Sequence, residues 1–273
     1  MMPTMTITIG VLALQGAFIE HVRLLQSAIE KHATPDVNWS LCEIRKPSEL
    51  EQCDALIIPG GESTTMALVA ERSGLMEPLR EFVKYINPPC NDEHSQCRRI
   101  ISDNFGLRIH RRPVWGTCAG LILLAETVDE GKKGGQELIG GLGVRARRNY
   151  FGRQIQSFQE ELSILGMGQE TFRAIFIRAP VVEELLPPTD GRPEVEIMAR
   201  LSTRDAGQAN QQTQEEGAIV AVKQGNVFAT SFHPELTSDE RLHWWWLTEV
   251  MRTLNMPSRK GEDDRPLAYR PAS

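Results

Sequence analysis

No apolar run in this 273-residue sequence approaches the length of about 20 residues that a helix needs to cross a membrane. The first ten residues also lack the basic segment and the long apolar block of a secretory signal. We therefore expect a cytoplasmic protein with no membrane partner.

The sequence has few cysteines, and its basic residues are outnumbered by acidic ones. Five cysteines are too few, and odd in number, for a disulfide framework in a chain of this length, so we expect free thiols. The net charge of −6 and the pI of about 5.6 argue against a nucleic-acid-binding surface. With 41% hydrophobic and 24% charged residues, the composition is that of a soluble globular protein with an ample core.

The first half of the sequence alternates apolar, strand-like runs with segments of helical periodicity. The near-continuous apolar run over 6–14 is typical of a central strand in a parallel sheet. Alternating strands and helices predict right-handed crossovers and an α/β fold. The expected strands are 6–14, 38–44 and 55–58, and the expected helices are 18–31, 65–72 with Ser63 and Thr64 as N-caps, and 75–86.

The second half is rich in strands that are separated by turns rather than by long helices. A final helix over about 239–254 carries three consecutive tryptophans, Trp244 to Trp246. These cannot share one helix face, so we expect at least one near the surface or a partner and the other two in the core. The expected strands are 142–149, 154–165, 172–177, 195–201, 218–222 and 227–230.

Three segments interrupt this pattern. Residues 87–112 are interpreted as a surface insertion, 205–216 as a polar, Gln-rich loop, and the residues from 257 onward as a disordered tail. The insertion contains Cys90, His94, Cys97 and His110, which could bind a metal ion. Their spacing does not match the tighter paired ligands of zinc sites, so we expect a loop and no metal.

The motif Gly116-Thr-Cys-Ala-Gly120 joins a short apolar run to a helix-forming run within 113–125. This is the pattern of a sharp strand-to-helix turn with a nucleophile, here Cys118, between two glycines. A helix N-terminus favours the thiolate, and the N–H of Ala119 could stabilise an oxyanion. The alternative is a buried cysteine at an ordinary turn.

His233 follows the last strand and precedes Pro234 and Glu235. Because parallel strands end at the edge where ligands bind, His233 can lie near Cys118 as its base, with Glu235 orienting it. The alternative is a simple turn. The other histidines have weaker contexts: His21, His32, His94, His110 and His243.

Taken together, several motifs in this order resemble class I glutamine amidotransferases, and more closely the glutaminase subunit of pyridoxal 5'-phosphate synthase. They are Gly10-Val-Leu-Ala-Leu-Gln-Gly-Ala17, Leu56-Ile-Ile-Pro-Gly-Gly-Glu-Ser-Thr-Thr-Met66, Gly116-Thr-Cys-Ala-Gly120, Arg148-Asn-Tyr-Phe-Gly-Arg-Gln154, Phe176-Ile-Arg-Ala-Pro180 and Ser231-Phe-His-Pro-Glu-Leu236.

The resemblance implies one flavodoxin-like, three-layer α/β domain over 6–255 with a central, mostly parallel sheet. The insertion at 87–112 and the tail at 256–273 depart from the compact bacterial form and point to a eukaryotic version, such as a fungal one.

The resemblance also implies a reaction, the hydrolysis of L-glutamine to L-glutamate and ammonia. Cys118 would form a thioester, His233 would transfer protons, and Glu235 would orient His233. The oxyanion would be held by N–H groups of Ala119 and Gly61. The family's glutamine-binding positions fall on Gly61, Glu62, Ser63, Arg148, Ile177 and Arg178.

No cofactor is implied, but a partner is. Ammonia would pass to a separate (β/α)8-barrel synthase subunit, whose docking would complete the oxyanion hole at Gly60 and Gly61. Three alternatives remain: a glutaminase that serves another biosynthetic synthase, a cysteine peptidase or chaperone on the same fold, and a catalytically silent interaction subunit.

Overall fold

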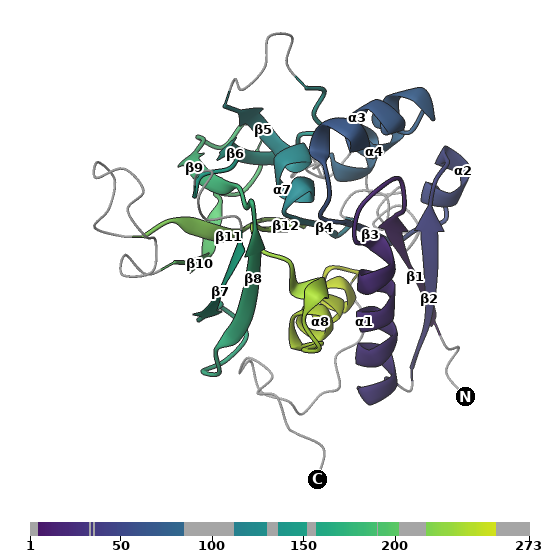
Figure 1. Cartoon of the computed structure of the whole chain (residues 1–273). Coiled ribbons are helices and arrows are strands. Elements are labelled where there is room, and N and C mark those ends of the chain that lie inside the picture. The colour runs from purple at the N-terminus through teal and green to yellow at the C-terminus, as the bar shows by residue number, and fades with distance from the viewer. Residues whose placement is uncertain are drawn as a thin grey trace, which may run out of the picture.

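A computed structural model of the chain describes most of the sequence (Figure 1). The expected insertion at 87–112, apart from its last residue, the Gln-rich loop and the tail beyond 256 lie outside the described residues. Along the described segments, no helix is both long and apolar enough to cross a membrane. The described residues are 5–32, 34, 36–84, 112–129, 136–151, 157–189, 191–201 and 217–254.

The first half of the chain forms most of the parallel part of a large sheet, as the alternating pattern predicts. The parallel strands lie in the order β2, β1, β3, β4 and β12, of which only β12 comes from the second half of the chain. The elements are β1 (Met5–Leu12), α1 (Phe18–Lys31), β2 (Val37–Ile44), α2 (Pro47–Leu50), β3 (Ala55–Ile58), α3 (Ser63–Arg72), α4 (Met76–Val83), β4 (Val114–Thr117) and α7 (Ala119–Leu124).

The second half continues the sheet with antiparallel pairings, in the order β12, β11, β9 and β6. β5 closes the edge parallel to β6, and β7 and β8 form a separate two-stranded ribbon. The elements are β5 (Ala125–Val128), β6 (Leu142–Arg147), β7 (Ser157–Leu162), β8 (Phe172–Ile177), β9 (Val181–Leu185), β10 (Glu196–Arg200), β11 (Ile219–Gln224), β12 (Val227–Thr230), η1 (Pro234–Leu236) and α8 (Arg241–Thr253).

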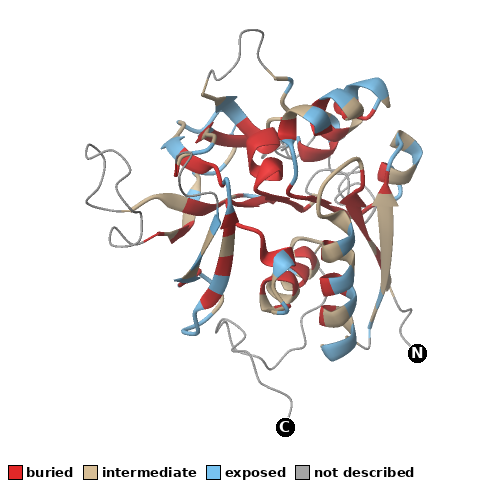
Figure 2. Cartoon of the chain, viewed as in Figure 1, coloured by how far each residue is buried: buried red, intermediate tan, exposed pale blue. Residues whose placement is uncertain are grey.

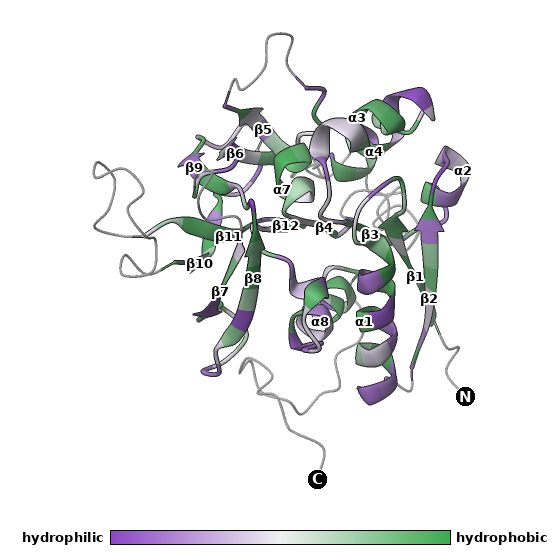
Figure 3. Cartoon of the chain, viewed as in Figure 1, coloured by the Kyte–Doolittle hydropathy of each residue, from purple (hydrophilic) through white to green (hydrophobic). Residues whose placement is uncertain are grey.

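Helices cover both faces of the sheet and give the expected three layers: α1 and α8 lie on one face, and α3, α4 and α7 on the other (Figure 1). The central strands β4 and β12 and the whole of α7 are buried (Figure 2). In keeping with this burial, α7 is strongly hydrophobic, whereas α1 and α8 carry hydrophobic and hydrophilic residues (Figure 3).

Each face of the sheet has its own core, and β4 contributes to both because successive strand residues point to opposite faces. Val114 belongs to the core under α3, α4 and α7, and Trp115 to the core under α1 and α8. The three tryptophans of α8 all pack on the second core, but only Trp246 is fully buried. The expectation that two of them lie in the core was therefore wrong, because Trp244 and Trp245 lie on the half-exposed flanks of the helix.

We expect Trp246→Ala to lower the free energy of unfolding by about 3–5 kcal/mol, because it opens a cavity between α8 and Trp115. Trp244→Ala is the matched control and should cost clearly less, because this ring is half-buried and stacks on His32. Urea unfolding of both variants tests this. Equal losses would contradict the assignment of Trp246 as the core residue of the three.

Candidate active site

The predicted strand-to-helix turn is present at Cys118, between β4 and α7. Cys118 has φ 47° and ψ −97°, a backbone conformation that residues other than glycine rarely adopt. A Cβ on Gly120 would lie 2.1 Å from the carbonyl oxygen of Ile58, and one on Gly116 would lie 2.6 Å from the carbonyl carbon of Gly120. Both flanking positions therefore require glycine, and the turn packs closely against the end of β3.

Cys118 is also the N-cap of α7. The carbonyl of Cys118 accepts the N–H of Ile122 at 3.3 Å. Because Ala119 is the first residue of α7, its N–H has no acceptor within the helix. This N–H lies directly after the thiol in the sequence. It is therefore free to donate to a negative oxygen that forms beside Cys118.

His233 and Glu235 form a buried hydrogen-bonded pair just beyond β12. The backbone N–H of His233 donates to the carbonyl of Ile175 in β8 at 2.8 Å, and this fixes the position of the His233 backbone. The short helix η1 then turns Glu235 back, so that its Oε1 lies 2.7 Å from Nδ1 of His233. Because a carboxylate only accepts, Nδ1 of His233 carries the hydrogen.

Cys118 and Glu235 both favour the protonated, positively charged form of His233. Burial lowers the pKa of His233, but hydrogen bonding to Cys118 and Glu235 and the charges of both outweigh burial and raise it to about 10. His233 is therefore an imidazolium at neutral pH, and it is hydrogen-bonded to the sulfur of Cys118.

The thiol of Cys53 has the opposite environment. Burial, reinforced by the nearby Cys42, raises the pKa of Cys53 to about 12, so it stays protonated and inert. All three described cysteines are unbridged, as expected: Cys42, Cys53 and Cys118.

The loop after β3 lies against the ring of His233. A Cβ on Gly60 would come within 2.3 Å of Cε1 of His233. The turn after β1 holds this loop: Ala17 donates its N–H to the carbonyl of Gly60 at 3.0 Å, and Oε1 of Gln15 accepts from the N–H of Glu62 at 2.8 Å. Because the C=O and N–H of a trans peptide point in opposite directions, the N–H of Gly61 points away from Ala17.

The N-cap of α3 differs from the prediction. The helix begins at Ser63, and the cap is Glu62, whose carboxylate accepts from the N–H groups of Thr64 and Thr65 at 3.1 and 2.7 Å. Ser63 and Thr64 are therefore not the caps, because the longer side chain of Glu62 reaches the free N–H groups first. Burial raises the pKa of Glu62, but the hydrogen bonds from Thr65 and Thr64 outweigh it and lower the pKa overall.

Of the expected glutamine-binding residues, the structure brings Ser63 and Arg148 together through a residue that the sequence did not suggest. Oε1 of Gln136 accepts from the hydroxyls of Ser63 and Thr64 at 3.1 and 3.3 Å and from the guanidinium of Arg148. Among the described residues, the buried Nε of Arg148 has no hydrogen-bond partner. Its N–H can therefore donate to an anionic or carbonyl oxygen of a ligand.

Ile177 is the last residue of β8 and Arg178 follows it, two and three residues beyond Ile175, whose carbonyl holds His233. Ile177 is 39% exposed, and Arg178 has φ 45°, a strained conformation for this residue type. Within the described part of the chain, the hydrogen bonds of Ser63 and Arg148 do not reach either residue.

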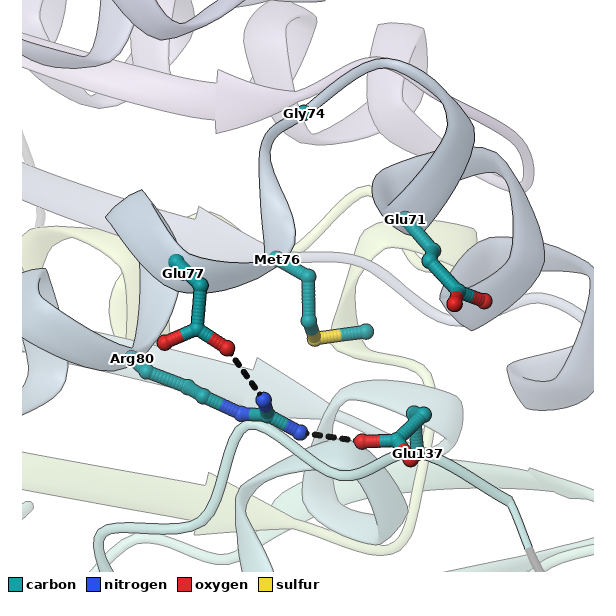
Figure 4. A pocket seen from close by; sticks show the side chains of 6 residues that line it. All are labelled: Glu71, Gly74, Met76, Glu77, Arg80 and Glu137. Atoms are coloured by element: carbon teal, nitrogen blue, oxygen red, sulfur yellow. Dashed lines mark hydrogen bonds and ion pairs between the residues drawn. The ribbon is translucent and has the colours of Figure 1, made fainter.

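A surface pocket of about 340 Å³ beside α3 and α4 is separate from this site (Figure 4). Arg80 pairs there with Glu77 and Glu137 and donates from Nε to the carbonyl of Leu138 at 3.0 Å, so it anchors the segment that carries Gln136. The pocket contains neither Cys118 nor His233. Its lining is Glu71, Gly74, Met76, Glu77, Arg80 and Glu137.

The described residues contain no group of three His, Cys, Asp or Glu side chains that could hold a metal ion. The metal candidates in the insertion, Cys90, His94, Cys97 and His110, lie outside the described residues.

Sequence reasoning did not find Gln136, His21 or His243. The two histidines are fully buried behind Glu235 and contact it or each other. His21 lies 222 positions before His243, and residues 130–135, directly before Gln136, are only glycine and charged residues. Only tertiary packing reveals the roles of these three residues.

The sequence matches the SNO glutamine amidotransferase family over residues 11–94 and 103–252. It is 42% identical to a probable pyridoxal 5'-phosphate synthase subunit of Arabidopsis thaliana, PDX2, over 88% of this chain and 84% of that protein. It is 40% identical to a probable subunit of the same synthase from Saccharomyces cerevisiae, SNO3, over 90% of this chain and 97% of that protein.

A solved structure described as a glutamine amidotransferase also resembles this chain. Its TM-score is 0.59 at 33% identity, and the match covers 90% of this chain and 98% of that one.

We expect the imidazole of His233 to remain protonated well above pH 8, because its pKa is raised to about 10. The stabilisation that this proton gives the folded state is fully present below the pKa of histidine in the unfolded chain, near 6.5. It is lost as the pH rises through about 10. Cys118→Ala should lower the pKa of His233 by removing one partner. A histidine-ring NMR titration measures this, with neutral His243, pKa about 3, as the internal control. Titration of His233 near pH 6.5 would contradict the pairing.

Proposed function

Because this chain belongs to the SNO glutamine amidotransferase family, we propose that it hydrolyses L-glutamine to L-glutamate and ammonia through Cys118, His233 and Glu235. The observation that carries the proposal is the position of His233. It is hydrogen-bonded to Glu235 on one side and raised in pKa by Cys118 on the other. A cysteine nucleophile beside an oriented histidine is the arrangement that acyl transfer requires.

The reaction has two halves. The Cys118 thiolate attacks the γ-carboxamide carbon, and the N–H groups of Ala119 and Gly61 stabilise the tetrahedral oxyanion. When this intermediate collapses, the C–N bond breaks, His233 gives its proton to the departing nitrogen, and ammonia leaves a thioester on Cys118. His233 then takes a proton from water, which attacks the thioester and releases glutamate and the thiolate. Glu235 keeps His233 in the required tautomer.

Gly61, Glu62, Ser63, Arg148, Ile177 and Arg178 are proposed to bind the substrate glutamine. An α-carboxylate is best held by a guanidinium and hydroxyl or N–H donors, which supports Arg148 and Ser63 for that group. Both lie on one polar cluster with Gln136. The buried Nε of Arg148, which has no hydrogen-bond partner in the described part of the chain, supports a further acceptor there.

The partner proposed for this chain is the barrel subunit of pyridoxal 5'-phosphate synthase, in a hetero-oligomer that receives the ammonia. Support comes from the relatives, which are named as subunits of that synthase. We place the complex in the cytoplasm and require no cofactor on this chain. Docking of the barrel would complete the oxyanion hole at Gly60 and Gly61, in a loop that the turn after β1 contacts through two hydrogen bonds.

Ammonia release from glutamine should be stimulated by the barrel subunit and should fall by about 10³-fold or more in Cys118→Ala. Cys42→Ala is the matched control and should keep full activity, because Cys42 lies in β2, away from His233. A coupled ammonia assay with and without the barrel measures both effects.

Activity that ignores the barrel would assign the chain to another synthase. Activity that survives Cys118→Ala would overturn the proposed chemistry, and no activity in any mixture would support a silent interaction subunit.

Arg148→Met should raise KM for glutamine roughly 10- to 100-fold with a smaller effect on kcat, because it removes a charged partner of the substrate. Arg147→Met is the matched control. The neighbouring Arg147 is 40% exposed and pairs with Glu183 instead, so KM should stay near the wild-type value. Steady-state kinetics in the presence of the barrel subunit measure both. Equal KM values for the two variants would remove Arg148 from the binding site.

A further inference from the structure

A buried chain of histidines continues behind Glu235. The carboxylate has no exposed surface, and it uses Oε1 to accept from His233. Its other oxygen, Oε2, lies 3.3 Å from Nε2 of His21, which is on α1 and is itself completely buried. Nδ1 of His21 lies 2.9 Å from Nε2 of His243 on α8. Two helices distant in sequence therefore converge on the side of Glu235 that faces away from Cys118.

The positions of these nitrogens determine where the hydrogens lie. A carboxylate has only lone pairs, so a lone pair on Nε2 of His21 would repel Glu235, and this nitrogen must carry the hydrogen. Nδ1 of His21 is then an acceptor and takes the N–H from Nε2 of His243. His243 is left with an unprotonated Nδ1, which agrees with the absence of any hydrogen-bond partner for that buried atom among the described residues. In this pattern both ring N–H groups face acceptors, whereas Nδ1 of His243 and Oε2 of Glu235 have no hydrogen bond among the described residues. The approach of Nε2 of His21 to Oε2 of Glu235, at 3.3 Å, is therefore a charge–dipole contact.

Both histidines are neutral. Burial lowers the pKa of His21 well below its usual value, with His243 and His233 adding to the effect, and burial lowers that of His243 to about 3 despite the charge of Asp239. A neutral His21 can place an N–H dipole beside Glu235 without cancelling the negative charge that Glu235 presents to His233. A cationic His21 would compete with His233 for that charge.

The histidine pair is surrounded by buried side chains. The ring of Trp115 packs edge-on against both His21 and His243, with centroid distances of 5.6 and 4.9 Å. The hydroxyl of Thr117, one residue before the nucleophile, lies 3.2 Å from Nε2 of His21. β4 therefore connects the histidine pair to the nucleophile turn, and the titratable groups that face the pair are Glu235, His233 and, beyond His243, Asp239.

We propose that His21 is a positioning residue for glutamine hydrolysis: it holds Oε2 of Glu235, and His243 fixes the tautomer that lets it do so. This inference rests on the proposed function, because it concerns the carboxylate of the proposed triad. It gives Glu235 a fixed orientation from both sides, so that Oε1 stays on His233 while the proton on His233 moves to substrate and back.

The test compares His21→Leu, which removes the donor, with His21→Gln, which places an amide N–H near the position of Nε2. In complex with the barrel subunit, His21→Leu should lower kcat roughly 10- to 100-fold, as for other buried partners that orient a reacting group, with little change in KM for glutamine. His21→Gln should recover most of this loss. His32→Leu is the matched control, because His32 follows the same helix but stacks on Trp244, and its kcat should be unchanged.

The pH profile separates positioning from a general loss of packing. The acid limb of kcat should move to higher pH in His21→Leu and stay in place in His21→Gln, because a buried carboxylate that has lost a donor is protonated more readily. A merely structural role would lower kcat at every pH without moving the limb. If His21→Leu does not fold, His243→Phe provides the same test, because His243 contacts His21 on the side away from Glu235. It should move the acid limb of kcat in the same direction, but by a smaller amount.

Unchanged kcat and an unchanged pH profile in His21→Leu would overturn the inference, and so would His21→Gln behaving like His21→Leu. Failure of the proposed function itself has a different signature, namely glutaminase activity that survives Cys118→Ala.

Discussion

The burial of the Glu235 carboxylate is the constraint on which the rest of the site depends. A charged group without exposed surface is costly unless donors surround it, and Glu235 has His233 on one oxygen and His21 facing the other. To supply these donors, the chain must bring β12, η1 and α1 to one point, with α8 behind them. The contacts that stabilise the buried carboxylate therefore also bring the residues of the proposed triad together.

The parallel half of the sheet gives this assembly its location. β1, β3, β4 and β12 are neighbours, so the segments that follow them meet at one edge. The turn after β1 holds the loop after β3, that loop lies against the ring of His233, and Gly120 of the nucleophile turn packs on the last residue of β3. Each of the three loops limits the movement of the next. This explains why glycine is needed wherever two of their backbones approach closely.

Much of this could be predicted from the sequence, because the information was local. Cys118 between two glycines, and His233 two residues before Glu235, are short patterns with a direct geometric meaning. The order of strands and helices in the first half was likewise readable from periodicity. β5 and β9 were not anticipated, because they are short and follow other apolar segments without a clear turn, and β9 carries two consecutive glutamates.

The rest depended on tertiary contacts. Nothing near His21 or His243 in the sequence indicates that α1 and α8 meet behind Glu235, and nothing near Gln136 indicates a bridge between Ser63 and Arg148. The N-cap of α3 was misassigned because serine and threonine are the usual caps, whereas the longer Glu62 reaches the same N–H groups. Single-residue propensity could not decide between these candidates.

The central claim is that glutamine is cleaved through a thioester on Cys118. Its most direct test is to mix the glutaminase and barrel subunits with glutamine, quench the reaction in acid during turnover, and identify the modified peptide by mass spectrometry. The account predicts a glutamyl group on the peptide that contains Cys118 and none on those that contain Cys42 or Cys53. Ammonia release with Cys118 unmodified, or with the glutamyl group on another cysteine, would contradict it.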